Sequence, residues 1–387
     1  QRQMCIRDRK KDINPAGGSQ TLVRETLTGA EGHAVSVTTE MGRVTRYETA
    51  YLEEGGTRIV KTYPFGLSKT LLWTPDAGQT VQYVDGTEIT LEQGPDPRFG
   101  MRIPIPKRLV EATPGGLTRE TLRTRDIQLG TINETISING KTYSIVHQEL
   151  SKTLTLTTPE GRQKVLVLDE KGRVASMQTN AMALVNVGYD SQGRAETISI
   201  GSRTYQMSYD PNDGFLTSVI DPLLGEIDFV RDAAGRILTK KLPDGRMLAF
   251  DYDANGNLVA VTPPGKPVHN LGYTALDMAD HYDPPNISGV DPDVTTFDYN
   301  LDGQITGVNQ PGSADITITY GAAGRLSSLG HPHDLVTATY DGTTAMLTGL
   351  NTSHGIDMTL GWDGFLLTDM AWSGPFIATL QAVSYTH

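Results

Sequence analysis

The chain has 387 residues, a formal net charge of −12 and a single cysteine. Its acidic balance, without a basic cluster, argues against nucleic acid or an anionic membrane as a partner, and one cysteine excludes a disulfide framework or a thiolate metal site. No apolar run approaches the roughly 18 residues of a membrane-spanning helix. The 41 glycines, with Thr, Val, Ile and Tyr crowded between them, favour many strands joined by turns.

The two ends of the chain look foreign to the rest. Residues 1–9 (QRQMCIRDR) and 384–387 (SYTH) resemble translated sequencing-adapter sequence, so we exclude both from fold reasoning. Cys5 lies in the first of them, and we therefore expect no native cysteine. We also expect the native protein to be longer, with this chain a fragment of it.

Residues 10–160 carry strand signals of uneven length. Apolar and polar residues alternate in 34–39, 80–83 and 135–138. Asn139-Gly140, between two alternating runs, is a strong hairpin signal. Leu117–Arg125 is the only segment with a pattern compatible with a short helix, and its threonines weaken that interpretation. We predict a divergent β-rich region here, which could consist of degenerate repeats.

From about residue 158 a turn pattern recurs with a fixed period. The turn glycines are Gly172, Gly193, Gly214, Gly235 and Gly256, each 21 residues after the last, followed by the pair Gly303 and Gly324. The residue three before the glycine is Asp169, Asp190, Asp232, Asp253 or Asn300; before Gly214 the acid is one place earlier, at Asp210, and before Gly324 the position holds Gly321. Asp at the first and Gly at the fourth position favour a type I turn. Repetition at a fixed period predicts a repeat architecture, with these aspartates and glycines as structural turn residues.

A second turn about halfway through each period divides it into two strands, so the array should be a meander of antiparallel hairpins. Before the turn, alternate residues such as Leu248, Phe250 and Tyr252 share an apolar, aromatic face, whereas Asp251 points to the other face. We predict the array over 161–347 and degenerate terminal repeats over 348–383.

The repeat has a recognisable form. It reads YDSQGRA at 189–195, RDAAGRI at 231–237, YDANGNL at 252–258, YNLDGQI at 299–305 and YGAAGRL at 320–326. Copies in register of this form resemble the YD repeats of RHS-repeat proteins, a family that includes bacterial polymorphic toxins, shell components of insecticidal toxin complexes and the animal teneurins. The match covers roughly 161–347 well and the flanking regions loosely.

The resemblance implies hairpin strips that spiral into a hollow shell. In toxin members such a shell encloses a C-terminal toxic domain, which an aspartyl autoprotease in the family's core region releases. Neither that core nor a toxin domain is recognisable in this sequence. The resemblance therefore implies a secreted or surface-displayed structural fragment, whose partners are the remaining repeats and an enclosed C-terminal domain.

Several motifs imitate functional sites. Asp251–Gly256 copies the first half of a calcium-binding EF-hand loop, but the twelfth position, which should be Glu, is Thr262. Gly140-Lys141-Thr142 ends like a phosphate-binding P-loop, yet Thr135 stands where the earlier glycine belongs. We interpret the first as a plain repeat turn and the second as a hairpin.

Two further motifs favour structural roles. His331-Pro332-His333-Asp334 offers metal ligands, but no other histidine or cysteine has metal-ligand spacing, so a surface loop is expected. Asp221-Pro222-Leu223-Leu224-Gly225 is similar to the DPxxG motif of the family's autoprotease, but it stands in register as a half-period turn.

No constellation of residues supports catalysis, and no cofactor is predicted. The expected function is a non-catalytic shell wall. The alternative is a surface adhesin whose aromatic side chains stack on glycans or contact a receptor. The position of the repeat tyrosines would distinguish the two: packing of Tyr252 and Tyr320 within the sheet favours the shell, and an open aromatic groove favours adhesion.

Overall fold

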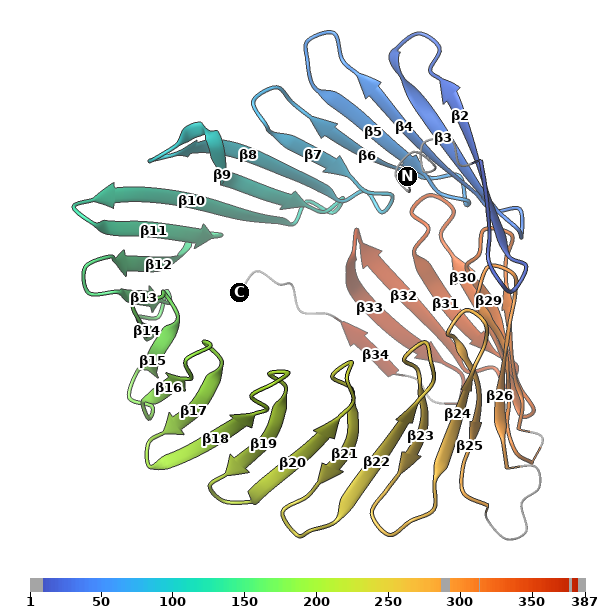
Figure 1. Ribbon diagram of the computed structural model, residues 1–387. Coiled ribbons are helices and arrows are strands. Elements are labelled where there is room, and N and C mark those ends of the chain that lie inside the picture. The colour runs from blue at the N-terminus through green and yellow to red at the C-terminus, as the bar shows by residue number, and fades with distance from the viewer. Residues whose placement is uncertain (1–9, 287–292, 313, 376–377, 382–387) are drawn as a thin grey trace. The chain divides into compact units, whose positions relative to one another are not determined.

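The computed structural model describes residues 10–286, 293–312, 314–375 and 378–381 (Figure 1). The adapter-like segments 1–9 and 384–387 lie outside the described residues. Within these ranges all of the helices and strands that could be assigned are β-strands, which confirms the all-β fold class. It follows that the described part of the chain contains no helix suited to crossing a membrane.

Most of the strands follow one another with short turns between them. From residue 11 to 148 they are β1 (Lys11–Ile13), β2 (Ser19–Thr26), β3 (Glu31–Thr39), β4 (Val44–Tyr51), β5 (Thr57–Thr62), β6 (Ser68–Trp73), β7 (Gln79–Gln82), β8 (Glu88–Asp96), β9 (Gly100–Ala112), β10 (Thr118–Gln128), β11 (Thr131–Ile138) and β12 (Lys141–Gln148). From residue 153 to 262 they are β13 (Thr153–Thr157), β14 (Gln163–Leu168), β15 (Val174–Thr179), β16 (Val185–Tyr189), β17 (Ala195–Ile200), β18 (Arg203–Tyr209), β19 (Leu216–Asp221), β20 (Gly225–Arg231), β21 (Ile237–Lys241), β22 (Met247–Tyr252) and β23 (Leu258–Thr262). The last are β24 (His269–Tyr273), β25 (Ala279–Asp283), β26 (Thr295–Tyr299), β27 (Ile305–Asn309), β28 (Ile316–Tyr320), β29 (Leu326–His331), β30 (Asp334–Tyr340), β31 (Leu347–Thr352), β32 (Asp357–Asp363), β33 (Leu366–Ser373) and β34 (Ala378–Gln381).

Within each of its two compact units consecutive strands pair antiparallel, as do β1 with β2, β22 with β23 and β33 with β34, in a meander of hairpins. The pairing of β22 with β23 is typical of the repeat: Phe250 lies opposite Val261, and the register shifts by one residue before Tyr252 pairs with Leu258. This shift is a β-bulge, which arises because the turn glycine takes a left-handed conformation that adds one residue to one strand.

Two local expectations for residues 117–148 have clear outcomes. The segment Leu117–Arg125 is not helical: from Thr118 onward it lies in β10, in which the threonines and the alternation of half-buried and exposed side chains fit a pleated strand. The hairpin at Asn139-Gly140 is confirmed: it joins β11 to β12, and both residues have positive φ angles, 47° and 82°, as a type I′ turn requires.

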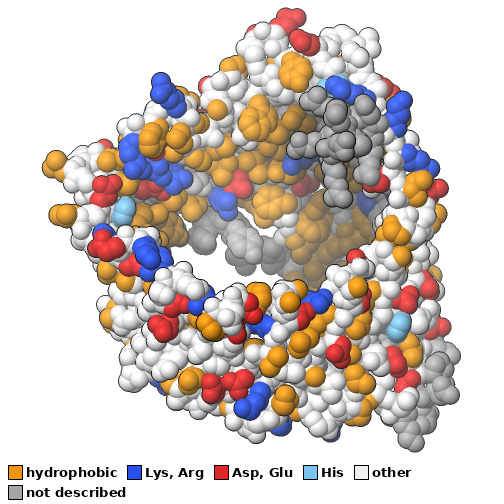
Figure 2. Space-filling view, in the orientation of Figure 1, with side chains coloured by type: hydrophobic (Ala, Val, Ile, Leu, Met, Phe, Trp, Pro, Cys, Tyr) orange, Lys and Arg blue, Asp and Glu red, His pale blue; other side chains and the backbone are white. Residues whose placement is uncertain are grey.

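Side chains on the apolar face of the strands are half-buried rather than buried. In β22, Leu248, Phe250 and Tyr252 are partly covered, while Asp251 on the opposite face is exposed. Among the described residues the only apolar side chains in the fully buried class are three alanines, Ala34, Ala50 and Ala260. The described strands therefore have no second layer packed densely against them. Figure 2 shows exposed apolar side chains interspersed with charges of both signs.

The chain divides into two compact units. Unit 1 contains 1–93, 108–120 and 272–387, and unit 2 contains 94–107 and 121–271. Within unit 1, hairpins that are far apart in sequence touch: Arg43 in the β3–β4 turn pairs with Asp302 in the β26–β27 turn at 2.9 Å, and Arg325 lies over the ring of Phe65. Unit 1 is therefore held by contacts between hairpins as well as along the meander.

Candidate functional site

The repeat turn is a self-contained hydrogen-bonded cap. In the turn at Asp169, one carboxylate oxygen accepts hydrogen bonds from the backbone N–H groups of Lys171 (2.8 Å) and Arg173 (2.9 Å). The same two bonds are made by Asp190, Asp232 and Asp253 to the residues two and four places on. The turn glycines Gly172, Gly193, Gly214, Gly235, Gly256, Gly303 and Gly324 all have φ between 78° and 98°, a region that favours glycine.

Departures from the motif are accommodated locally. The Asp210 loop is one residue longer, because Gly214 N–H bonds to the carbonyl four rather than three residues back. At the next departure the Asn300 amide oxygen replaces the carboxylate and accepts from Asp302 and Gln304 N–H, both at 3.0 Å. At Gly321, which has no side chain, only the backbone bonds remain.

The repeat tyrosines tie each hairpin to the one before it. The hydroxyl of Tyr189 donates to the carbonyl oxygen of Val174 at 2.9 Å, and Tyr252 donates to that of Ile237 at 3.1 Å. Tyr209, Tyr299 and Tyr320 make corresponding bonds to Ala195, Ala279 and Ile305. These side chains therefore pack within the wall of hairpins.

Two residues that the sequence pattern missed replace the tyrosine. Arg231 Nε donates to the Leu216 carbonyl at 3.0 Å, and Trp362 Nε1 donates to the Leu347 carbonyl at 2.6 Å. Both acceptors lie fifteen residues upstream, the same separation as for Tyr252 and Ile237. Their position in the repeat was the available signal, since each stands directly before the Asp of its turn.

The arginine after the turn glycine links successive turns. Arg194 bonds to Asp190 at 2.7 Å, lies over the Tyr209 ring at 4.3 Å, and donates to the Gly214 carbonyl at 3.0 Å. Arg173, Arg236 and Arg325 likewise cover Tyr189, Tyr252 and Tyr340. A planar guanidinium can stack and donate several bonds at once, which an ammonium group cannot.

The turn aspartates are held ionised by these contacts. The backbone N–H of Arg173, followed by its guanidinium, lowers the pKa of Asp169. The side-chain amide of Asn257 is the largest cause that lowers the pKa of Asp253. For Asp232 burial is the largest single influence and raises the pKa, but the hydrogen bonds from Arg236 and the Ala234 N–H, together with the charge of Arg236, make the net shift downward. The carboxylates thus stabilise turns and are not available as general acids near neutral pH.

The motifs that imitate functional sites have structural roles. The Asp253 carboxylate accepts bonds from Asn255 and Asn257 N–H, and exposed Asp251 belongs to strand β22. Gly140-Lys141-Thr142 belongs to a hairpin turn and strand β12, with no helix following it. The Asp221 carboxylate caps its own turn, accepting from Leu223 N–H at 2.8 Å and Leu224 N–H at 3.0 Å.

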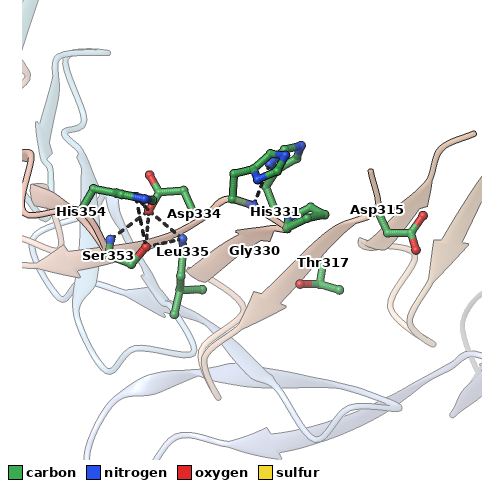
Figure 3. Close-up of a pocket in the computed structure, with 10 residues that line it drawn as sticks. Asp315, Thr317, Gly330, His331, Asp334, Leu335, Ser353 and His354 are labelled. Atoms are coloured by element: carbon green, nitrogen blue, oxygen red, sulfur yellow. Dashed lines mark hydrogen bonds and ion pairs between the residues drawn. The ribbon is translucent and has the colours of Figure 1, made fainter. Parts of the chain in front are cut away.

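An open cavity of about 610 Å³ lies beside the turn between β29 and β30 (Figure 3). Its lining includes His331, His333, Asp334, Ser353 and His354. His331 Nδ1 accepts from the His333 N–H at 3.3 Å, and the two rings are 5.3 Å apart. Within the described ranges no group of three or more His, Cys, Asp or Glu could hold a metal ion.

The Ser353–Asp334–His354 cluster in this cavity is not arranged as a nucleophile and base. The Ser353 hydroxyl donates to the Asp334 carboxylate at 2.5 Å, and His354 pairs with the same oxygen at 3.2 Å. The Ser353 hydroxyl gives its proton to the carboxylate, and its contact with His354 Nδ1 is long, at 3.5 Å, so the serine is not activated by the imidazole. The bond from Ser353 is the largest cause that lowers the pKa of Asp334 to about 2.

Unit 2 contains a buried charged cluster that sequence reasoning missed. Asp96 is 4% exposed and Glu134 6% exposed. Arg125 bonds to both carboxylates, at 2.9 and 2.8 Å, and Arg123 bonds to Glu134 at 2.6 Å. Each buried carboxylate is compensated. Arg125 and Glu134 also line a cavity of about 290 Å³, whose other lining residues are Arg98, His147, Ile132, Ile145, Leu154 and Leu168.

Comparison with known proteins agrees with this geometry. The family model described as the teneurin YD-shell matches residues 10–383. The chain belongs to the teneurin YD-shell family. Teneurin-3 of Danio rerio is 22% identical in an alignment over 352 residues that covers 86% of this chain but 12% of that protein. The resemblance to YD-repeat proteins is therefore confirmed.

Two solved structures share the fold of this YD-shell chain. The TcdB2–TccC3–Cdc42 crystal structure superposes with a TM-score of 0.54 and 13% identity, over 98% of this chain and 28% of that one. The Tc holotoxin pore of Photorhabdus luminescens superposes with a TM-score of 0.52 and 12% identity, over 94% of this chain and 27% of that one. The chain spans only a minor part of each of these proteins, and its role is that of a structural, shell-forming segment.

Proposed function

We propose that this chain is a non-catalytic wall segment of a secreted or cell-surface shell, and that the intact shell encloses a C-terminal toxin or effector domain. The observation that carries the proposal is the apolar face of the hairpins, whose side chains remain half-buried. An apolar face of this extent is stable when neighbouring repeats or an enclosed partner cover it.

The residues of the repeat support a wall and not a reactive site. The turn carboxylates bond to backbone N–H groups, the tyrosine hydroxyls bond to backbone carbonyls, and arginines cover the tyrosine rings. These groups serve cohesion between hairpins. The fold shared with the Tc structures is consistent with the same use.

Protease protection of the intact, longer protein tests the enclosure. A C-terminal domain inside a shell should survive trypsin that digests the same domain expressed alone. Gly256→Val, which disturbs a turn of the wall, should make the enclosed domain accessible, whereas Glu160→Gln should leave it protected. Equally rapid digestion of the domain in the intact protein and in isolation would contradict the proposal.

One observation favours the second candidate, a carbohydrate-binding adhesin. Tyr51 on β4 and Trp73 on β6 are 51% and 43% exposed, and both align with Thr57 on the strand between them, so they share a face. Two aromatic rings about 10 Å apart could stack on neighbouring sugars. Glycan-array binding by this chain that is lost in Trp73→Ala would favour this function, and no binding would favour the wall alone.

A further inference from the structure

Two hairpins late in the chain place a carboxylate on turns near its start, all within unit 1. Asp302 and Asp363 each directly precede the turn glycine of their hairpin, β26–β27 and β32–β33. Asp302 meets the turn 39–42, which joins β3 to β4, and Asp363 meets the turn 113–116, which joins β9 to β10. The two contacts have the same atomic arrangement.

At the first contact a threonine hydroxyl relays between backbone and carboxylate. Thr39 Oγ1 accepts from the Arg43 N–H at 3.3 Å and donates to Asp302 Oδ2 at 2.8 Å. Asp302 Oδ1 accepts from the Met41 N–H at 3.2 Å. The Arg43 guanidinium pairs with the same carboxylate at 2.9 Å, with 10% of the arginine and 7% of the aspartate side chain exposed.

The second contact repeats this relay. Thr113 Oγ1 accepts from the Leu117 N–H at 3.1 Å and donates to Asp363 Oδ2 at 2.6 Å. Asp363 Oδ1 accepts from the Gly115 N–H at 2.5 Å. In both cases the carboxylate accepts hydrogen bonds from the N–H of the third turn residue and from the hydroxyl of the first.

Other turns obtain the same carboxylate from within. In the Asp169 turn the first residue supplies it and bonds to the third N–H. In the Thr74 turn the first residue is again threonine, and its hydroxyl bonds to the carboxylate of the third residue, Asp76. The third residues of the two contacted turns are Met41 and Gly115, which have no carboxylate. Each turn receives its carboxylate from a distant hairpin: Asp302 lies 263 residues after Thr39, and Asp363 lies 250 residues after Thr113.

We propose that these two threonine turns are receptors for the carboxylate that precedes a turn glycine in a distant hairpin, and that the two contacts set which hairpins lie against each other in unit 1. Backbone turns of a repeat protein look alike, so packing of one hairpin on another leaves several registers close in energy. A shift by one repeat would leave Asp302 and Arg43 buried without each other, which is strongly unfavourable. The inference rests on these contacts and does not require an enclosed domain.

A turn threonine can itself bond to the N–H groups of its turn. In the Thr274 turn the hydroxyl accepts from both the third and the fifth N–H, those of Leu276 (3.2 Å) and Met278 (3.3 Å). Loss of Asp302 should therefore leave the β3–β4 hairpin formed and remove only its attachment to β26–β27. This separates the proposed role from ordinary turn capping.

An exchange of the carboxylate between the two sides of each contact tests the proposal, with thermal unfolding of the whole chain as the measurement. Asp302→Asn and Asp363→Asn should each raise the unfolding equilibrium constant about tenfold or more, since a charge-assisted bond is lost. Thr39→Asp should restore stability to Asp302→Asn, because the acid then stands on the turn and the introduced amide can donate to it. Thr113→Asp should restore Asp363→Asn in the same way.

The crossed combinations provide matched controls. Thr39→Asp should not restore Asp363→Asn, and Thr113→Asp should not restore Asp302→Asn. In the otherwise native chain Thr39→Asp should destabilise, since it places a second carboxylate against Asp302. If either aspartate variant fails to fold alone, recovery of folding by the matched threonine variant supports the proposal. Equal rescue by matched and crossed partners, or no rescue by either, overturns it.

Discussion

The phenol hydroxyl of Tyr252 lies 3.1 Å from the carbonyl oxygen of Ile237, fifteen residues earlier, and donates a hydrogen bond to it. Tyr189 and Tyr320 make the same bond, over the same sequence separation, to Val174 and Ile305. Each bond joins one hairpin to the preceding one by a side chain, in addition to the backbone ladder. Stability should therefore depend on interactions between neighbouring repeats.

Removal of the hydroxyl alone should weaken this link. Tyr252→Phe leaves the ring under Arg236 but deprives the Ile237 carbonyl of its donor, and we expect a loss of about 1 kcal/mol in the free energy of unfolding. Tyr143→Phe, at an exposed position on β12, is the control and should have no measurable effect. Thermal denaturation followed by circular dichroism compares the two, and equal melting temperatures would contradict the structural role of the hydroxyl.

Substitution of the turn glycine should lower the free energy of unfolding because of its backbone conformation. Gly256 has a φ of 98°, and an added Cβ would meet only the Arg236 guanidinium at an ordinary contact distance of 3.5 Å, so backbone strain decides the outcome. Gly256→Val should cost about 1–3 kcal/mol because a β-branched residue is unfavourable at positive φ. Glu160→Gln, on an exposed turn, retains an acceptor oxygen and should change the melting temperature little. A Gly256→Val protein with the same melting temperature as the native chain would refute the turn assignment.

The guanidinium of the repeat arginine should not be replaceable by an ammonium. Arg194→Lys keeps the charge beside Asp190 but loses the stacking on Tyr209 and the simultaneous bond to the Gly214 carbonyl, so we expect destabilisation of about 1 kcal/mol. Arg246→Lys, at an exposed pair with Asp244, is the matched control and should be close to neutral. Chemical denaturation of both variants is the measurement.

Acid should destabilise the fold in a defined pH range. Hydrogen bonds, the largest from the Thr343 hydroxyl, lower the pKa of Asp341 from 3.8 to about 2. A pKa that is lower in the folded state means that the stabilisation is present above pH 3.8 and is lost as the pH falls towards 2. Melting temperatures measured between pH 5 and pH 2, as rough limits, should decline less steeply for Asp341→Asn than for the native chain.

The stability of the fold should depend on the buried carboxylate of Glu134 in unit 2. Glu134→Ala leaves Arg123 and Arg125 without their shared partner, and we expect a cost of about 3–5 kcal/mol. Glu120→Ala, which removes one of two carboxylates that Arg108 contacts at a half-exposed position, should cost far less. Comparable losses in the two variants would show that burial of Glu134 contributes nothing.

Much of the repeat could be read from the sequence because its determinants are local. The Asp253 carboxylate and the positive φ of Gly256 act within five residues, so turn chemistry alone predicts where hairpins close. The alternation of Leu248, Phe250 and Tyr252 likewise predicts which side chains share a face. The weak helical pattern at Leu117–Arg125 shows the opposite case, since pairing with the neighbouring strand, which lies outside the segment, overrode it.

By itself the sequence determined the period, the turns and the family, since each depends on residues that repeat within one hairpin. Only the tertiary structure decided that Arg231 and Trp362 serve in place of tyrosine, because an N–H donor matches a hydroxyl only once its distance to the Leu216 or Leu347 carbonyl is known. It alone decided that Asp302 completes the turn of Thr39. No local pattern encodes a contact across 263 residues, because the folding of every hairpin between them sets where the two side chains meet.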